Sequence, residues 1–225
     1  MMYLSQLILN PACRLVQRDL TRPYEMHRTL SHAFPQGETH VARDTDDAAG
    51  ILFRVDQQEG AISVLVQSKT APDWAWLAEQ HDSRGYHYLS RPVASKAVSI
   101  ELAEGQILAF RLRANPTKRL SAGKGNIGRR VGIYDEEGQL AWLARKGEQH
   151  GFRMLQAQVS RDDKIEIEKA IERDGKVHKL ELLSARFDGV LQVTDPDKLI
   201  QAVETGIGSA KGFGFGLLSL APTPP

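Results

Sequence analysis

The chain has 225 residues, of which 41% are hydrophobic and 25% are charged, and its formal net charge is +1. This composition is typical of a globular protein and excludes a disordered or fibrous chain, while the length favours two domains of roughly 100 residues each. The single cysteine, Cys13, excludes an internal disulfide and a zinc cluster, and the absence of a basic leader or of an apolar run of about 20 residues predicts a cytoplasmic protein without membrane segments.

The spacing of apolar residues in the first half predicts four strands and two helices. Short alternating or continuous apolar runs indicate strands, whereas apolar residues three and four positions apart indicate helices. In chain order we expect the strand Tyr3–Leu9, the helix Pro23–Ala33, the strands Leu52–Asp56 and Ala61–Gln67, the helix Asp73–Gln80 and a strand within Tyr86–Leu102.

The second half repeats this order of elements. We expect the strand Ile107–Ala114, the helix Glu137–Gln149, the strand Phe152–Ser160, turns at Asp174-Gly175 and Asp188-Gly189, a helix that starts at Pro196 after the cap Asp195 and stops at Gly206, the strand Leu217–Leu220 and a frayed end Ala221–Pro225. Strand, helix, strand, strand, helix and strand, written twice, is typical of an α+β fold of tandem ferredoxin-like (RRM-like) domains. The predicted domains are residues 1–95 and 96–225.

Positive charge is concentrated in one segment, although the net charge is close to zero. Between Gly105 and Tyr134 the chain has no Asp or Glu. The basic residues of this segment are Arg111, Arg113, Lys118, Arg119, Lys124, Arg129 and Arg130. Such clustering is typical of contacts with nucleic-acid phosphates, although a single run of charge is more often a solvated loop.

The segment Gly206–Gly216 brackets Lys211 with glycines just after a predicted helix. Glycine permits positive φ and brings main-chain N–H groups close to a ligand, so the segment can form a cradle for phosphates. It lacks the Gly-Lys-Ser/Thr ending of a nucleotide-binding phosphate loop. The alternative is a glycine-rich turn that only lets a helix and a strand pack closely.

A short helical segment carries the strongest candidates for catalysis. Tyr24, His27 and Ser31 share one helix face at positions i, i+3 and i+7, whereas Met26 and Leu30 can face the core. A histidine exchanges protons near neutral pH, and a phenol one turn away can orient it or a phosphate. The pair is therefore a candidate general acid–base site, with a purely structural histidine as the alternative.

Five segments in this chain carry a resemblance that runs from end to end. They are Met2–Ser5, Pro23–Leu30, Phe110–Lys118, Ala141–Leu143 and Gly206–Pro222. In this order they resemble the CasE family, the CRISPR RNA-processing endoribonucleases of type I-E systems. The resemblance implies tandem ferredoxin-like domains and a cut at the base of the CRISPR-repeat stem-loop.

The resemblance also implies a mechanism that needs no metal and no cofactor. In it, the ribose 2′-OH attacks the scissile phosphate and leaves a 2′,3′-cyclic phosphate and a 5′-OH. The protein then stays on the 3′ hairpin of the guide RNA together with the other subunits of the Cascade complex.

Roles can be carried over to individual positions of this sequence. The family's catalytic histidine falls on His27, as general acid to the 5′-oxygen or as base to the 2′-OH, and Tyr24 is expected to orient the 2′-OH or the phosphate. The implied RNA-binding residues are Arg28, Arg111, Arg113, Lys118, Arg119, Lys124, Arg129, Arg130, Lys169, Arg173 and Lys211. Two other functions stay open: a non-catalytic subunit that binds RNA hairpins, and a protein that binds a small phosphorylated ligand through Gly206–Gly216.

Overall fold

The computed structural model describes residues 1–34, 50–58, 60–120, 130–161, 165–173 and 176–223. The chain divides into two compact units. The first contains Met1–Glu101, Glu204–Gly206 and Lys211–Leu217, and the second contains Leu102–Val203, Ile207–Ala210 and Leu218–Pro225. Part of the glycine-rich segment therefore belongs to the same unit as the N-terminal residues.

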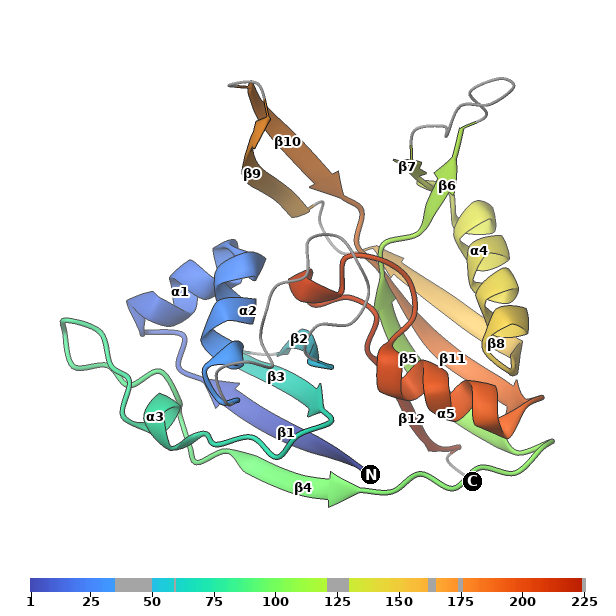
Figure 1. Cartoon of the computed structure of the whole chain (residues 1–225), viewed down its shortest axis with the longest axis horizontal. Coiled ribbons are helices and arrows are strands. Elements are labelled where there is room, and N and C mark those ends of the chain that lie inside the picture. Colours follow the sequence, from blue (N-terminus) through green and yellow to red (C-terminus); the bar gives the residue numbers. More distant parts are fainter. Residues whose placement is uncertain (35–49, 59, 121–129, 162–164, 174–175, 224–225) are drawn as a thin grey trace. The chain divides into compact units, whose positions relative to one another are not determined.

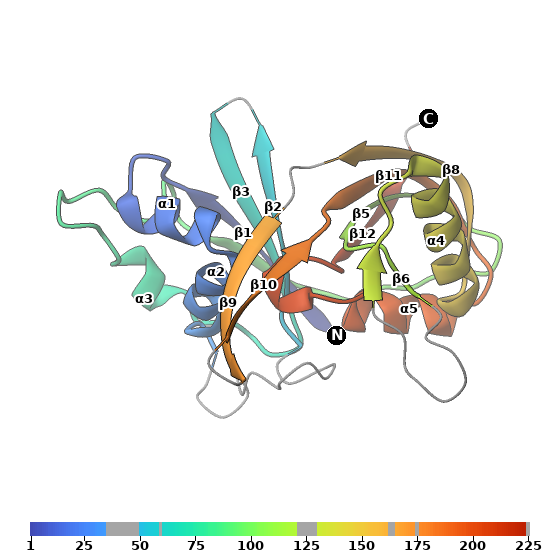
Figure 2. The ribbon, with the colours of Figure 1, turned by 90° about the horizontal axis from the view of Figure 1, so that it is seen from above.

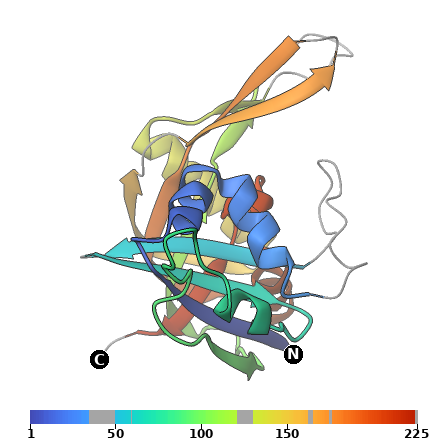
Figure 3. The same cartoon turned by 90° about the vertical axis from the view of Figure 1, so that its left-hand side faces the viewer.

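The first unit is built on one antiparallel sheet. Its elements are β1 Met2–Leu9, α1 Arg14–Thr21, α2 Pro23–Ser31, β2 Leu52–Gln58, β3 Ala61–Ser68, α3 Ala75–Ala78, β4 Ala94–Val98 and the 3₁₀ turn η1 Lys211–Phe213. The strands lie in the order β2-β3-β1-β4. Helices α1 and α2 lie on one face of this sheet (Figures 1 and 3).

The core of the first unit lies between the sheet and its helices. Alternate residues of β1 and β3 point to the same face of a sheet, so that Leu7 and Val64 are both buried against this core. Met26 and Leu30 of α2 are fully buried in the same cluster. Burial of each such side chain stabilises the fold by about 1.5–3 kcal/mol, and it fixes the rotation of α2 and hence the direction of its polar faces.

The second unit repeats the plan and carries two added hairpins. Its elements are β5 Ile107–Ala114, β6 Thr117–Arg119, β7 Arg130–Gly132, α4 Glu136–Gln149, β8 Phe152–Arg161, β9 Ile165–Arg173, β10 Lys176–Leu182, β11 Ala185–Val193, α5 Pro196–Thr205 and β12 Leu218–Pro222. The main sheet has the order β12-β5-β11-β8, while β6-β7 and β9-β10 form separate two-stranded sheets. The β9-β10 hairpin extends away from the main sheet of its unit (Figures 1 and 2).

Helices α4 and α5 supply the core of the second unit. Trp142 of α4 stacks on Phe187 of β11 with 6.0 Å between ring centroids and 18° between planes. Leu199 of α5 is fully buried. The amide of Lys198 donates to Asp195 Oδ1 at 3.1 Å, which confirms the predicted N-cap of α5.

The two four-stranded sheets have the same strand order. If the strands of each main sheet are numbered along the chain, the order is 2-3-1-4 in the first unit. In the second unit, where β5, β8, β11 and β12 are numbers 1 to 4, the order is 4-1-3-2, which is the same order read from the other edge. This order, with helices after the first and third strands, is that of the ferredoxin-like fold. The predicted tandem ferredoxin-like α+β fold is confirmed. Among the described residues, the helices are too short or too polar to cross a membrane.

Several local expectations differ from the structure. Helix α1 was not expected, and α3 is shorter than the predicted helix Asp73–Gln80. Ala221 and Pro222 are not frayed, because they extend β12 and pair with β5. The turn predicted at Asp174-Gly175 lies outside the described residues.

The turn predicted at Asp188-Gly189 is wrong, because both residues lie within β11. A Cβ at position 189 would lie 2.1 Å from the carbonyl oxygen of Gln156 on β8. The strand pairing also shifts register between Val190 and Leu191. Glycine at position 189 therefore permits a close approach of two strands and does not make a turn.

Candidate active site

Helix α2 positions Tyr24, His27 and Ser31 along one face. Pro23 occupies its first turn, where the missing N–H costs no helical hydrogen bond. The predicted burial of Met26 and Leu30 is confirmed, and it leaves the side chain of His27 half-buried at the edge of the core. Tyr24 is 40% exposed. The helix thus presents an accessible phenol one turn before a partly shielded imidazole.

Ser31 orients the His27 ring. The Ser31 hydroxyl donates to the main-chain oxygen of His27 at 2.8 Å, and its Oγ lies 3.3 Å from His27 Nδ1. Because the hydroxyl proton is already used, Oγ acts as the acceptor, and the proton of a neutral imidazole is on Nδ1. His27 Nε2 then keeps its lone pair for a substrate.

The glycine-rich segment reaches this histidine through η1. A Cβ at Gly212 would lie 3.4 Å from His27 Cδ2 and 3.8 Å from Nε2. Next in the chain, Phe213 lies 6.4 Å from Tyr24 between ring centroids. On another side, Phe53 meets the His27 ring edge to face at 6.3 Å. Burial among these groups lowers the pKa of His27 below its ordinary value, because it disfavours the charged imidazolium.

Several glycines of this segment serve packing. A Cβ at Gly214 would lie 3.0 Å from the Phe53 ring, and one at Gly206 would lie 2.9 Å from the side chain of Leu52. Both glycines have positive φ, 84° and 78°. The predicted binding residue Lys211 begins η1 and is half-buried beside this site. Close packing of the segment on β2 is what places Lys211 and Gly212 against α2.

A buried carboxylate anchors α2 behind the site. Asp19 of α1 is 1% exposed and accepts hydrogen bonds from the hydroxyls of Thr29, at 2.6 Å, and Tyr88, at 3.0 Å. The exposed guanidinium of Arg18 also pairs with it at 2.7 Å. Burial and the nearby carboxylate raise the pKa of Tyr88, so its hydroxyl keeps the proton that it donates. These bonds tie α1, α2 and the segment after α3 together.

The predicted binding residue Arg28 does not share the face of His27. Its guanidinium pairs with Glu25 at 3.1 Å, and its side chain is 59% exposed. Glu25, Arg28 and Thr29 line a hollow on the neighbouring side of α2. Arg28 is therefore close to the site along the helix but faces a different surface.

The main sheet of the second unit carries the predicted residues Arg111 and Arg113. Both alternate with buried apolar residues of β5, so they project from the face opposite α4 and α5. Arg111 Nε donates to Asp188 Oδ1, and Arg186 Nε donates to Asp188 Oδ2 at 2.9 Å. One carboxylate thus holds two guanidinium groups on this face.

Arg186 was not predicted from the sequence. Its strand was interrupted by the wrongly predicted turn at Asp188-Gly189. An extended assignment for Ala185–Val193 would have placed Arg186 and Asp188 on one face of the strand. The observed pairing places Arg186 directly opposite Arg113. The sequence pattern that indicates this strand is the alternation of Arg186 and Asp188 with apolar residues.

The other predicted RNA-binding residues lie on the two hairpins or outside the described residues. Lys118 and Arg119 are exposed on β6, and Arg130 is exposed on β7, where it pairs directly with Arg119. Two like charges opposite each other are unfavourable unless an anion lies near them. Lys169 and Arg173 lie on β9, and the structure describes the path of that strand but not their side chains. Lys124 and Arg129 are outside the described residues.

Among the described residues, no three His, Cys, Asp or Glu side chains gather so that they could hold a metal ion.

A family model described as CRISPR associated protein matches residues 2–222. The chain belongs to this family.

Named members place it in the CasE group of type I-E systems. It is 38% identical over 230 residues to the CRISPR-associated endoribonuclease Cse3 of Thermus thermophilus, covering 98% of this chain and 100% of that protein. It is 37% identical over 236 residues to the CRISPR system Cascade subunit CasE of Escherichia coli, with the same coverage. A solved structure of the endoribonuclease Cse3 bound to a 19-nucleotide RNA matches with a TM-score of 0.79 and 37% identity, over 98% of this chain and 99% of that one.

Proposed function

We propose that this CRISPR-associated protein is an endoribonuclease that cuts CRISPR precursor RNA at the base of the repeat stem-loop. The observation that carries the proposal is the His27 imidazole, oriented by Ser31 and placed one helical turn from Tyr24. Relatives that align with nearly the whole chain are named as an endoribonuclease and as a Cascade subunit. The protein then remains on the 3′ hairpin of its product and joins the other Cascade subunits in the cytoplasm.

The reaction is a transesterification that this site can catalyse by proton transfer. The 2′-oxygen next to the scissile phosphate forms a new P–O bond as the bond to the 5′-oxygen breaks. The 2′-OH loses its proton to solvent and the leaving 5′-oxygen gains one from His27, so the products are a 2′,3′-cyclic phosphate and a 5′-OH. His27 Nε2 delivers the proton to the leaving oxygen, and Tyr24 orients the 2′-OH or the phosphate. In-line alignment of the attacking 2′-oxygen with the leaving 5′-oxygen supplies much of the remaining rate acceleration.

The pKa of His27 decides when it can act as an acid. In the protein without RNA, burial lowers this pKa, so the neutral ring predominates at pH 7. A bound phosphate adds a negative charge beside the ring, which favours the imidazolium. Binding of the substrate therefore favours the protonated His27 ring, which is the form that can donate a proton to the leaving oxygen.

We expect the pKa of His27 to lie below its ordinary value in the protein alone, because the ring is buried, and to rise when RNA binds. NMR titration of the ring should show this with a repeat hairpin that carries a 2′-deoxyribose at the scissile position, since this RNA binds without being cut. His87 is exposed outside α2, and its ring resonances serve as a control that should change little when RNA binds. An unchanged His27 pKa in the complex would contradict the acid role.

Phosphate binding is assigned to the arginines on the second unit's sheet. We expect Arg186→Ala to weaken binding of the hairpin and to reduce the salt dependence of log K by about one unit of slope. Arg111→Ala should behave alike, because Asp188 holds both groups. The matched control is Arg145→Ala, which removes the same charge from an exposed position on α4. Equal effects of Arg145→Ala and Arg186→Ala in filter binding at several salt concentrations would count against this face.

One experiment tests the proposed function as a whole. Purified protein is incubated with a labelled repeat hairpin from its own genome, with EDTA present, and the product ends are analysed. A single cut at the stem base that leaves a cyclic phosphate supports the proposal. Tight binding without a cut would favour the alternative of a non-catalytic hairpin-binding subunit. The absence of binding would contradict both.

A further inference from the structure

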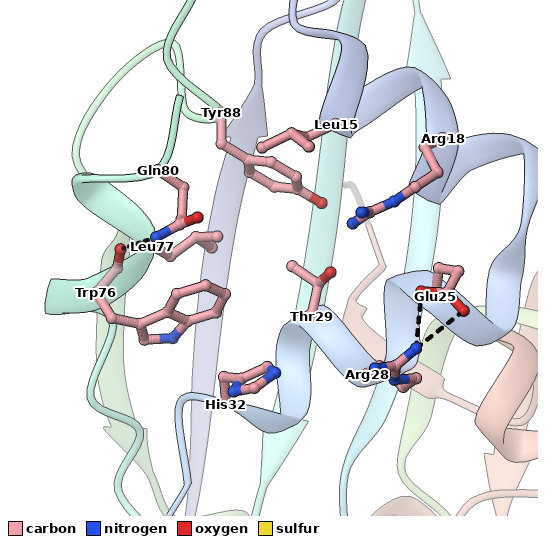
Figure 4. A pocket seen from close by; sticks show the side chains of 10 residues that line it. All are labelled: Leu15, Arg18, Glu25, Arg28, Thr29, His32, Trp76, Leu77, Gln80 and Tyr88. Atoms are coloured by element: carbon pink, nitrogen blue, oxygen red, sulfur yellow. Dashed lines mark hydrogen bonds and ion pairs between the residues drawn. The ribbon is translucent and has the colours of Figure 1, made fainter. Parts of the chain in front are cut away.

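The first unit contains a hollow of about 200 Å³ beside α2 (Figure 4). Its lining comes from α1, α2, α3 and the segment that follows α3. The side chains that line it are Leu15, Arg18, Glu25, Arg28, Thr29, His32, Trp76, Leu77, Gln80 and Tyr88. Sites for drug-sized ligands have volumes of about 300–1,000 Å³, so this hollow suits a smaller, flat group.

The base and one wall of the hollow are apolar and aromatic. Leu77 and Tyr88 are almost fully buried at its base. Trp76 forms a wall with His32, and their ring centroids lie 5.0 Å apart at an angle of 53°. Such a wall offers an aromatic face against which another planar ring can stack.

The opposite wall consists of two guanidinium groups, as Figure 4 shows. Carboxylates hold both of them: Arg18 pairs with Asp19 and Arg28 pairs with Glu25. Their positive charges are thereby largely offset, so charge alone does not make this a phosphate site. A held guanidinium still offers a flat face for stacking and several N–H donors for the edge of a ring.

We propose that this hollow receives one unpaired nucleobase of the RNA, next to the phosphate bound at His27. Bases in single-stranded RNA are commonly recognised by stacking on aromatic or arginine planes and by hydrogen bonds to their edges. Here Trp76 and His32 provide the stacking wall, while the guanidinium groups and the amide of Gln80 provide donors and acceptors.

The position of the hollow on α2 favours a nucleotide neighbouring the cut. His27 and Arg28 are consecutive residues of one helix and lie on adjacent faces. Because Arg28 lines the hollow, a strand whose scissile phosphate lies at His27 can place a neighbouring base there. An apolar side chain of a protein partner fits less well, because it would bury two guanidinium groups and a carboxylate without new hydrogen bonds. This inference rests on the proposed function.

Abasic substitution of the RNA tests the proposal directly. A repeat hairpin with a 2′-deoxyribose at the scissile position is prepared with one abasic site at each unpaired nucleotide beside the stem in turn. Base stacking on an aromatic residue is worth about 1–3 kcal/mol, so we expect one abasic position to weaken binding by about 5- to 150-fold. The same position should have little further effect on Trp76→Ala, because the stacking partner is already gone.

His32→Ala guards against a folding defect in Trp76→Ala, because His32 is exposed on the same wall. His32→Ala should also reduce the loss of RNA affinity that the same abasic position causes. If no abasic position depends on Trp76 or His32, while the uncut hairpin binds tightly and the natural hairpin is cleaved, the inference is wrong and the proposed function stands. If Trp76→Ala instead leaves every RNA measurement unchanged but weakens assembly with Cascade subunits, the hollow binds protein. Loss of binding to every RNA by the wild-type protein would overturn the proposed function itself.

Discussion

Replacing His27 with alanine is expected to slow cleavage of the repeat hairpin by about 10²- to 10⁴-fold, the usual worth of a positioned acid–base group. RNA affinity should change much less than the rate, because His27 makes at most one charged contact with a phosphate and the other proposed phosphate contacts remain. The loss arises because the 5′-oxygen must then leave without a proton from the protein. Single-turnover cleavage at saturating protein, together with a binding measurement on the 2′-deoxy hairpin, separates the two quantities.

Two variants make this experiment specific. His87→Ala removes an exposed histidine outside α2 and should cleave like the wild type. Ser31→Ala removes the acceptor at Nδ1 and should reduce the rate less than His27→Ala, because the ring loses its orientation but keeps its proton. Equal losses of binding and cleavage in His27→Ala would show that the histidine supports the fold and not the chemistry.

The fold could be predicted because the sequence patterns that indicate its helices and strands are local. Alternating strands such as β5 and the capped start of α5 are visible in a few consecutive residues. Helix α1 was missed because its buried face contains Asp19, a carboxylate that breaks the apolar period. The buried carboxylate is stabilised by Arg18, Thr29 and Tyr88, and Tyr88 is distant in the sequence.

The candidate site could be predicted in part for the same reason. Tyr24, His27 and Ser31 lie on one helix, so their common face follows from helical spacing. The approach of Gly212 to His27 depends on where the chain returns after the second unit, and no local pattern contains that path. The pairing of Asp188 with Arg111 likewise needs the register of β5 and β11, in which the two residues lie opposite each other.

Gly189→Ala is expected to be the most destabilising small substitution in the second unit's sheet. The added Cβ would lie 2.1 Å from the carbonyl oxygen of Gln156 and 2.8 Å from the Cα of Ala157, and both are backbone atoms of β8. A flexible side chain could rotate away, but backbone atoms can move only if β8 and β11 separate. Overpacking usually costs about 1–3 kcal/mol, and this position should lie at or above the upper end of that range.

The matched control for this substitution is Gly132→Ala on β7 of the same unit. A Cβ there would meet its nearest atoms, in Tyr134 and Leu183, at 3.4–3.6 Å, and φ is not in the left-handed region. Restriction of the unfolded chain should then make Gly132→Ala neutral or stabilising by up to about 1 kcal/mol. Chemical denaturation of both variants measures the difference. Similar midpoints for the two would refute the close strand contact at Gly189, and with it the strand assignment that places Asp188 between Arg111 and Arg186.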